Sequence, residues 1–145
     1  MDRSLPHPLS AVLAPALRER PEVLEAYLFG SQARGDAQAH SDVDVAVYID
    51  HGLSGDAPFG YAAEITSLLM AALGRNDVDV VVLNDAPPLL YGRVLRDGVR
   101  VFSRDLRATT VRESQAISRY CDYVPHLAKI DAAHAARIAR GDFGR

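Results

Sequence analysis

Residues 42–49 read Asp-Val-Asp-Val-Ala-Val-Tyr-Ile, so acidic and β-branched side chains alternate along the run. This pattern is typical of a β-strand, in which successive side chains point to opposite faces. Asp42 and Asp44 then share one face, and the three valines share the other, where burial favours them. Two carboxylates this close repel each other, and a hard divalent cation such as Mg²⁺ relieves the repulsion. The run predicts a metal site, although an isolated Asp-x-Asp is more often a solvated strand edge.

A Gly-Ser pair precedes this strand, with ten residues between Ser31 and Asp42. Residues 27–29 before it indicate the end of a short strand. Gly30 allows close approach of the backbone to a ligand, and Ser31 offers a hydroxyl and an amide at an expected helix N-terminus. Such a turn suits a triphosphate. Alone it is an ordinary turn, but together with the acidic strand it predicts a site for a metal-bound nucleoside triphosphate.

A third carboxylate lies on a later predicted strand, residues 78–83. Asp79 interrupts an otherwise apolar run, which Asn84 and two prolines end. Asp77 would point to the same face and is an alternative. Both would be ordinary solvated carboxylates if the strand began at the surface.

These segments together resemble the signature of the DNA polymerase β-like nucleotidyltransferase superfamily, and specifically of its small, minimal (MNT) branch. In that branch Gly-Ser-x-Ala-Arg-Gly is followed by Ser-Asp-x-Asp. The matching residues here are Gly30, Ser31, Ala33, Arg34, Gly35, Ser41, Asp42 and Asp44. The branch also carries a Val-Asp-hydrophobic run ending in Leu-Asn, which favours Asp79 over Asp77 as the third carboxylate.

The resemblance implies a division of roles within the site, with ATP as substrate and two Mg²⁺ ions as cofactors. The implied catalytic and metal-binding residues are Asp42, Asp44 and Asp79. The implied nucleotide-binding residues are Gly30, Ser31, Arg34 and Ser41. Arg34 either offsets charge on the leaving pyrophosphate or is a solvated helix residue, and the sequence leaves both interpretations open.

Residues 90–102 and 119–123 resemble segments of MntA-type antitoxins. Such proteins are encoded with a HEPN-family toxin ribonuclease and inactivate it by transferring AMP from ATP to a toxin tyrosine. The resemblance therefore implies a protein adenylyltransferase that forms a hetero-oligomer with a HEPN toxin. One alternative is a small-molecule, aminoglycoside-type nucleotidyltransferase. Such enzymes usually carry a substantial helical domain that binds the substrate, whereas only about forty residues follow the last predicted strand here. The other is a nucleotide-binding antitoxin that acts by occlusion without catalysis.

The order of predicted elements indicates an α/β (α+β) fold of polymerase β-like type, a small mixed sheet with flanking helices and a C-terminal helix. We expect strands at 25–29, 42–49, 78–83 and 99–102 and a loop at 51–58. A helix is expected at 10–20, with Ser10 as N-cap and a kink or late start at Pro15. Further helices are expected from Ser31, at 61–73, at 88–97, and at about 105–140, where Pro125 would interrupt or bend the helix. One nucleotidyltransferase domain would span 1–145, with its core at about 23–103.

Composition excludes several other classes of protein. The net charge of −3 provides no basic field for nucleic acid, so direct nucleic-acid binding is not expected. No apolar run is long enough for a membrane span, and the single cysteine, Cys121, cannot form an intramolecular disulfide. We expect a cytoplasmic protein. His40 adjoins the acidic strand but is expected to face solvent, and His126 and His134 share a helix face without enough ligands for zinc.

Overall fold

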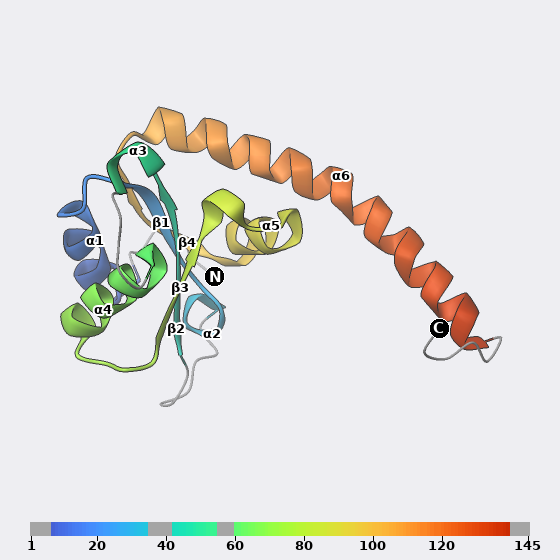
Figure 1. Ribbon diagram of the computed structural model, residues 1–145, viewed down its shortest axis with the longest axis horizontal. Helices are drawn as coiled ribbons and strands as arrows, with labels where there is room; N and C mark the ends of the chain where they lie inside the picture. Colours follow the sequence, from blue (N-terminus) through green and yellow to red (C-terminus); the bar gives the residue numbers. More distant parts are fainter. Residues whose placement is uncertain (1–6, 35–41, 55–59, 140–145) are drawn as a thin grey trace.

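The computed structural model describes residues 7–34, 42–54 and 60–139. Its centre is a four-stranded mixed sheet of order β3-β2-β1-β4 (Figure 1). Strand β1 (Val23–Phe29) pairs antiparallel with β2 (Val43–Ile49) and with β4 (Val99–Ser103), and β3 (Val78–Val82) runs parallel to β2. The mixed α/β sheet with flanking helices confirms the predicted fold class.

One face of the sheet carries the main hydrophobic core. Helices α1 (Ser10–Arg18) and α4 (Tyr61–Leu73) cover this face (Figure 1). The valines of β2 that were predicted to be buried have no exposed surface, and they pack with Leu13, Leu17, Ile65 and Leu69. Gly74 ends α4 in the left-handed conformation, as predicted for a C-cap.

The opposite face carries a smaller core under α5 (Pro88–Asp97) and the first part of α6 (Leu106–Ala139). Its buried residues are Tyr27, Ala46, Leu83, Tyr91, Val94 and Ala116. Ala46 lies two residues after Asp44 on β2, so this face is also the one to which the acidic side chains point. The site and the second core therefore share one surface of the sheet.

A buried ion pair fixes α6 to the sheet. Glu25 on β1 is fully buried, and the Arg112 guanidinium on α6 donates to it from Nε at 2.7 Å and from Nη2 at 2.5 Å. The Thr109 hydroxyl donates to the same carboxylate at 2.9 Å. A buried charge is tolerated only when it is paired and hydrogen-bonded in this way. These contacts set where α6 crosses β1.

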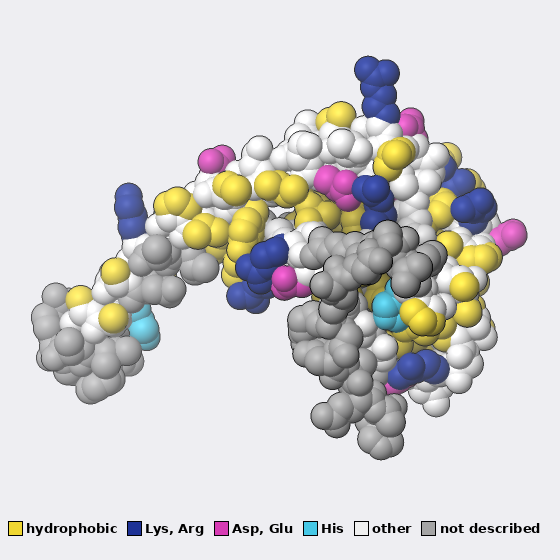
Figure 2. Space-filling view, turned by 180° about the vertical axis from the view of Figure 1, so that it is seen from behind, with side chains coloured by type: hydrophobic (Ala, Val, Ile, Leu, Met, Phe, Trp, Pro, Cys, Tyr) yellow, Lys and Arg dark blue, Asp and Glu magenta, His cyan; other side chains and the backbone are white. Residues whose placement is uncertain are grey.

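Beyond this anchor α6 leaves the body of the protein as a long arm (Figure 1). Every described side chain from Val124 to Arg137 is exposed. Five of the seven large hydrophobic residues that are exposed in the described part belong to α6: Leu106, Val111, Ile117, Val124 and Ile130. Figure 2 shows hydrophobic side chains at the surface of this helix. None of the described helices is long and apolar enough to cross a membrane.

Helix α1 differs from the prediction at both ends. It ends at Arg18, and Ser10 is its first residue rather than its N-cap, which is Leu9. The reason is that His7 supplies the acceptors: its carbonyl accepts from the Ser10 N–H at 2.9 Å and its Nδ1 from the Leu9 N–H at 3.1 Å. Pro15 lies inside the helix and does not delay its start.

The predicted loop at 51–58 was wrong in its first half, where α3 (His51–Ser54) forms. Asp50 explains this turn, because its carboxylate accepts from the Gly52 N–H at 2.9 Å. Residues 55–59 lie outside the described part of the chain.

The remaining differences are confined to the ends of elements. The strand predicted at 25–29 begins two residues earlier, at Val23, and Asp42 directly precedes β2. Strand β3 ends at Val82, where the 3₁₀ turn η1 (Leu83–Asp85) begins, and the Asn84 amide bonds the backbone N–H and C=O of Ile49. Helix α6 starts after Asp105, whose carboxylate accepts from two backbone N–H groups, and continues through Pro125.

Helices α5 and α6 approach closely at Gly92, because a Cβ there would collide with the Tyr120 ring. We predict that Gly92→Ala destabilises the protein, because overpacking costs about 1–3 kcal/mol. The higher helix propensity of alanine offsets only about 0.5–1 kcal/mol of this cost. Urea unfolding measures the difference. With Tyr120→Ala already present the same change should cost less, because the ring is gone while the Cβ of residue 120 stays 2.8 Å from the new methyl group. A Gly92→Ala protein more stable than the parent would contradict this packing.

Candidate functional site

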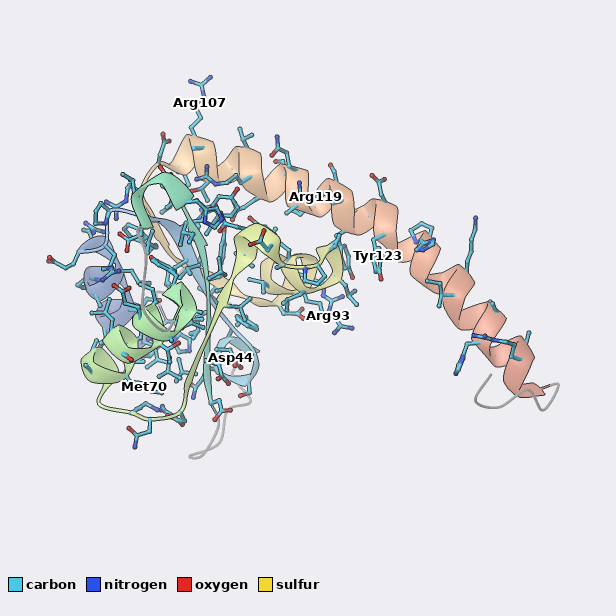
Figure 3. The ribbon with its side chains drawn as sticks, viewed as in Figure 1. Asp44, Met70, Arg93, Arg107, Arg119 and Tyr123 are labelled. Atoms are coloured by element: carbon cyan, nitrogen blue, oxygen red, sulfur yellow. The ribbon has the colours of Figure 1, made fainter. Side chains whose placement is uncertain are left out.

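The turn between β1 and α2 (Ser31–Arg34) lies against the acidic strand. Gly30 has φ +72°, which favours glycine, and a Cβ at this position would collide with Oδ2 of Asp44. The pairing of Phe29 with Asp44 across β1 and β2 produces this contact. Figure 3 shows Asp44 beside α2. The Gly-Ser turn and the acidic strand, predicted from separate parts of the sequence, are therefore in direct contact.

Asp79 lies beside Asp44 in the sheet. The two residues are register partners on the parallel strands β3 and β2, so their side chains leave the same face about 4.8 Å apart. Asp44 is half-buried and Asp79 is exposed. Two carboxylates at this spacing favour binding of a cation between them. The same register puts the valine preceding each aspartate on the core side.

Asp77, the alternative third carboxylate, is held by Arg75. The guanidinium donates to both carboxylate oxygens, from Nε at 2.8 Å and from Nη2 at 2.6 Å. This hydrogen bonding, together with the charges of Asp77 and Asp42, raises the pKa of Arg75. Asp77 is thus engaged by a neighbouring arginine, whereas Asp79 is in register with Asp44, and this difference favours Asp79.

The other predicted site residues are only partly placed. Asp42 is exposed at the position before β2, and Ser31 is the half-buried first residue of α2. Arg34 is the last residue of α2, but its side chain, like all of Ser41 and His40, lies outside the described residues. Over 7–34, 42–54 and 60–139, no three His, Cys, Asp or Glu residues form a group that could hold a metal ion. The metal-binding set of Asp42, Asp44 and Asp79 stays a prediction.

The chemistry of the placed residues suits a metal-bound phosphate group. Aspartate oxygens are the ligands that Mg²⁺ prefers, and Asp44 and Asp79 present them from adjacent positions. The missing side chain at Gly30 makes room for the Asp44 carboxylate, so this carboxylate lies directly against the backbone of the turn. The arrangement fits a cation held by carboxylates beside a turn that binds phosphate.

Two polar groups near the sheet were not found from the sequence. The His7 ring contacts the backbone of α2, because its Nε2 lies 2.9 Å from the Gln32 carbonyl oxygen. The Tyr91 hydroxyl is buried without a hydrogen-bond partner in the described part, and burial raises the pKa of Tyr91 to about 12. No pattern of spacing connects residue 7 with residue 32, so only the folded chain shows the first contact.

The contact at Gly30 predicts an unequal cost of two glycine substitutions. Gly74 also has positive φ, +65°, but nothing lies within 4 Å of a Cβ there. Gly74→Ala should cost about 1–2 kcal/mol of unfolding free energy from the left-handed backbone alone. Gly30→Ala should cost about 1–3 kcal/mol more, because the methyl group also displaces Asp44. Equal losses in urea unfolding would show that Asp44 does not lie against this turn.

Comparison with known proteins identifies a related family and several related folds. The family model described as polymerase beta, nucleotidyltransferase matches residues 12–107. A search of curated proteins gave no match. The chain is similar to a solved structure described as a toxin–antitoxin with AMP-PNP, with TM-score 0.70, 27% identity, and coverage of 86% of this chain and 98% of that chain.

Two further structures show the same similarity. One is described as the tri-AMPylated Shewanella oneidensis HEPN toxin in complex with MNT antitoxin, with TM-score 0.63, 25% identity, and coverage of 86% of this chain and 95% of that chain. The other is described as a mutant of the toxin–antitoxin MntA-HpeT, with TM-score 0.65, 29% identity, and coverage of 83% of this chain and 93% of that chain. The family match spans most of the chain and includes the Gly-Ser turn and all three aspartates. The chain belongs to the polymerase β nucleotidyltransferase family.

Proposed function

We propose that this protein is an antitoxin that transfers AMP from ATP to a tyrosine hydroxyl of a partner HEPN toxin, and that it does so in the cytoplasm with Mg²⁺. The observation that carries the proposal is the contact of the Gly30 backbone with Asp44, with Asp79 in register beside it. In a chain of this family, that arrangement supports a phosphate-binding turn beside metal-binding carboxylates.

In the proposed reaction the tyrosine oxygen forms a bond to the α-phosphorus, and the bond from that phosphorus to the bridging oxygen of pyrophosphate breaks. Asp42 and Asp44 would hold Mg²⁺, which neutralises charge on the triphosphate when bound. Gly30 and Ser31 would hold the outer phosphates so that pyrophosphate leaves in line. Asp79 would accept the proton of the tyrosine hydroxyl or orient that hydroxyl.

A protein acceptor is favoured by the neighbours and by α6. The similar structures are complexes of a toxin with an antitoxin, and one contains an AMPylated HEPN toxin. The described part of the chain after β4 is one long helix rather than a helical domain that encloses a small substrate. These observations support a toxin over an aminoglycoside-type substrate.

The exposed apolar residues of α6 supply a docking surface for that toxin. Leu106, Ile117 and Val124 are spaced by 11 and 7 residues, close to whole helical turns, so they form one stripe along the arm. Exposed apolar stripes of this kind mark interaction surfaces. The stripe begins beside the sheet and continues along the arm, so a toxin bound there could reach the face that carries Asp44.

The catalytic part of the proposal predicts that Asp44→Asn lowers AMP transfer to the cognate toxin by at least about 100-fold. Asp85→Asn is the matched control, because Asp85 is an exposed aspartate after the far end of β3. The measurement is the mass gained by the purified toxin in units of AMP after incubation with ATP and Mg²⁺. If the parent protein leaves the toxin unmodified, the proposed function is wrong. If the unmodified toxin is nevertheless neutralised, the antitoxin acts by occlusion.

The docking part predicts that Val124→Asp weakens binding of the toxin about 10-fold or more, since a charge in a buried apolar contact loses its hydration. Ser118→Asp places the same charge at an exposed position on another side of α6 and should change the affinity little. Calorimetry with the purified toxin gives both dissociation constants. If the two variants bind alike, the stripe is not the toxin surface.

A further inference from the structure

The His7 side chain joins the segment before α1 to the turn that carries Ser31. Its Nδ1 accepts from the Leu9 N–H at 3.1 Å, and its Nε2 lies 2.9 Å from the Gln32 carbonyl oxygen. An amide N–H can only donate, so Nδ1 is the acceptor and the ring proton is on Nε2. His7 therefore donates to Gln32, and both ring nitrogens are used in one neutral tautomer.

This bond adds a hydrogen bond from a distant side chain to the packing of α2 against β1 and β2. The described part of the helix is four residues long, and a single turn is not stable by itself in water. Each backbone carbonyl of such a turn is an acceptor for a hydrogen bond. Ala33 packs into the main core, and His7 provides one of these acceptors with a donor. The position of α2 thus depends on a residue far away in the sequence.

Gln32 directly follows Ser31, and Gly30 before them lies against Asp44. A shift of the Gln32 carbonyl would move the hydroxyl and amide of Ser31 relative to the carboxylates. We propose that His7 is a positioning residue of the nucleotide-binding turn, acting through the Gln32 carbonyl and setting affinity for ATP. This inference rests on the proposed function, and it adds a residue outside the family signature.

Two substitutions separate the two bonds of the ring. The amide nitrogen of a glutamine occupies about the place of Nε2, so His7→Gln keeps the donor to Gln32 and loses the acceptor for Leu9. The side-chain oxygen of an asparagine occupies about the place of Nδ1, so His7→Asn keeps the Leu9 bond and loses the bond to Gln32. His134→Asn, at an exposed position on the arm, is the control.

The experiment measures the dissociation constant for ATP with Mg²⁺ by calorimetry, KM and kcat for AMP transfer, and amide hydrogen exchange of residues 31–34. His7→Asn should raise the dissociation constant and KM by about 3- to 10-fold with kcat nearly unchanged, the effect of one hydrogen bond. It should speed exchange in α2 by a similar factor and leave α4 as in the parent. His7→Gln and His134→Asn should behave like the parent protein.

Unchanged exchange in α2 and unchanged affinity in His7→Asn would overturn the inference. So would equal effects of His7→Asn and His7→Gln, or faster exchange throughout the sheet, because either result means that His7 only stabilises α1 or the fold. If the parent protein does not bind ATP, the proposed function fails. Hydrogen exchange still decides in that case whether His7 positions the turn.

Discussion

The contact between the Gly30 backbone and the Asp44 carboxylate is the constraint on which the rest of the structure depends. It requires β1 to end beside the start of β2, and it requires a residue without a side chain at a left-handed position. Together with the family match and the register of Asp44 with Asp79, this contact indicates a site for a metal-bound phosphate group. The sheet is thus the part of the molecule that brings the predicted ligands of phosphate and metal together.

One face of the sheet carries the main core and the other carries the site, and the alternation of valine and aspartate side chains along β2 determines which is which. The valine face buries apolar area against α1 and α4, which supplies most of the stabilisation. The opposite face carries the aspartates at one end and the second core at the other. A shift of one residue in the register of β2 would exchange these faces, so the hydrophobic core also fixes where the carboxylates point.

Much of the fold was predictable from local pattern. The alternation at 42–49, the apolar periodicity at 61–73 and the glycine after it gave strands and helices close to those observed. The candidate residues Gly30, Ser31, Asp44 and Asp79 were predicted because their spacing follows from strand geometry and a family signature.

The features that sequence reasoning missed depend instead on tertiary contacts. No local sequence pattern indicates that the His7 ring accepts from the Leu9 N–H at the start of α1 and also contacts the Gln32 carbonyl. The buried pair of Glu25 and Arg112 was likewise not predictable, since each residue alone resembles a solvated charge and the two lie 87 positions apart.

The long arm of α6 has a consequence for how a protein of this architecture can change over evolutionary time. Its proximal end is fixed by a buried charge, whereas the side chains described beyond Val124 touch solvent. Substitutions at exposed positions far from the core have small and nearly additive effects on stability. The arm can therefore accumulate substitutions while the acidic strand and its turn stay intact. With toxin recognition on α6 as proposed, selectivity and chemistry can diverge separately, because the site residues precede β4 and the arm follows it.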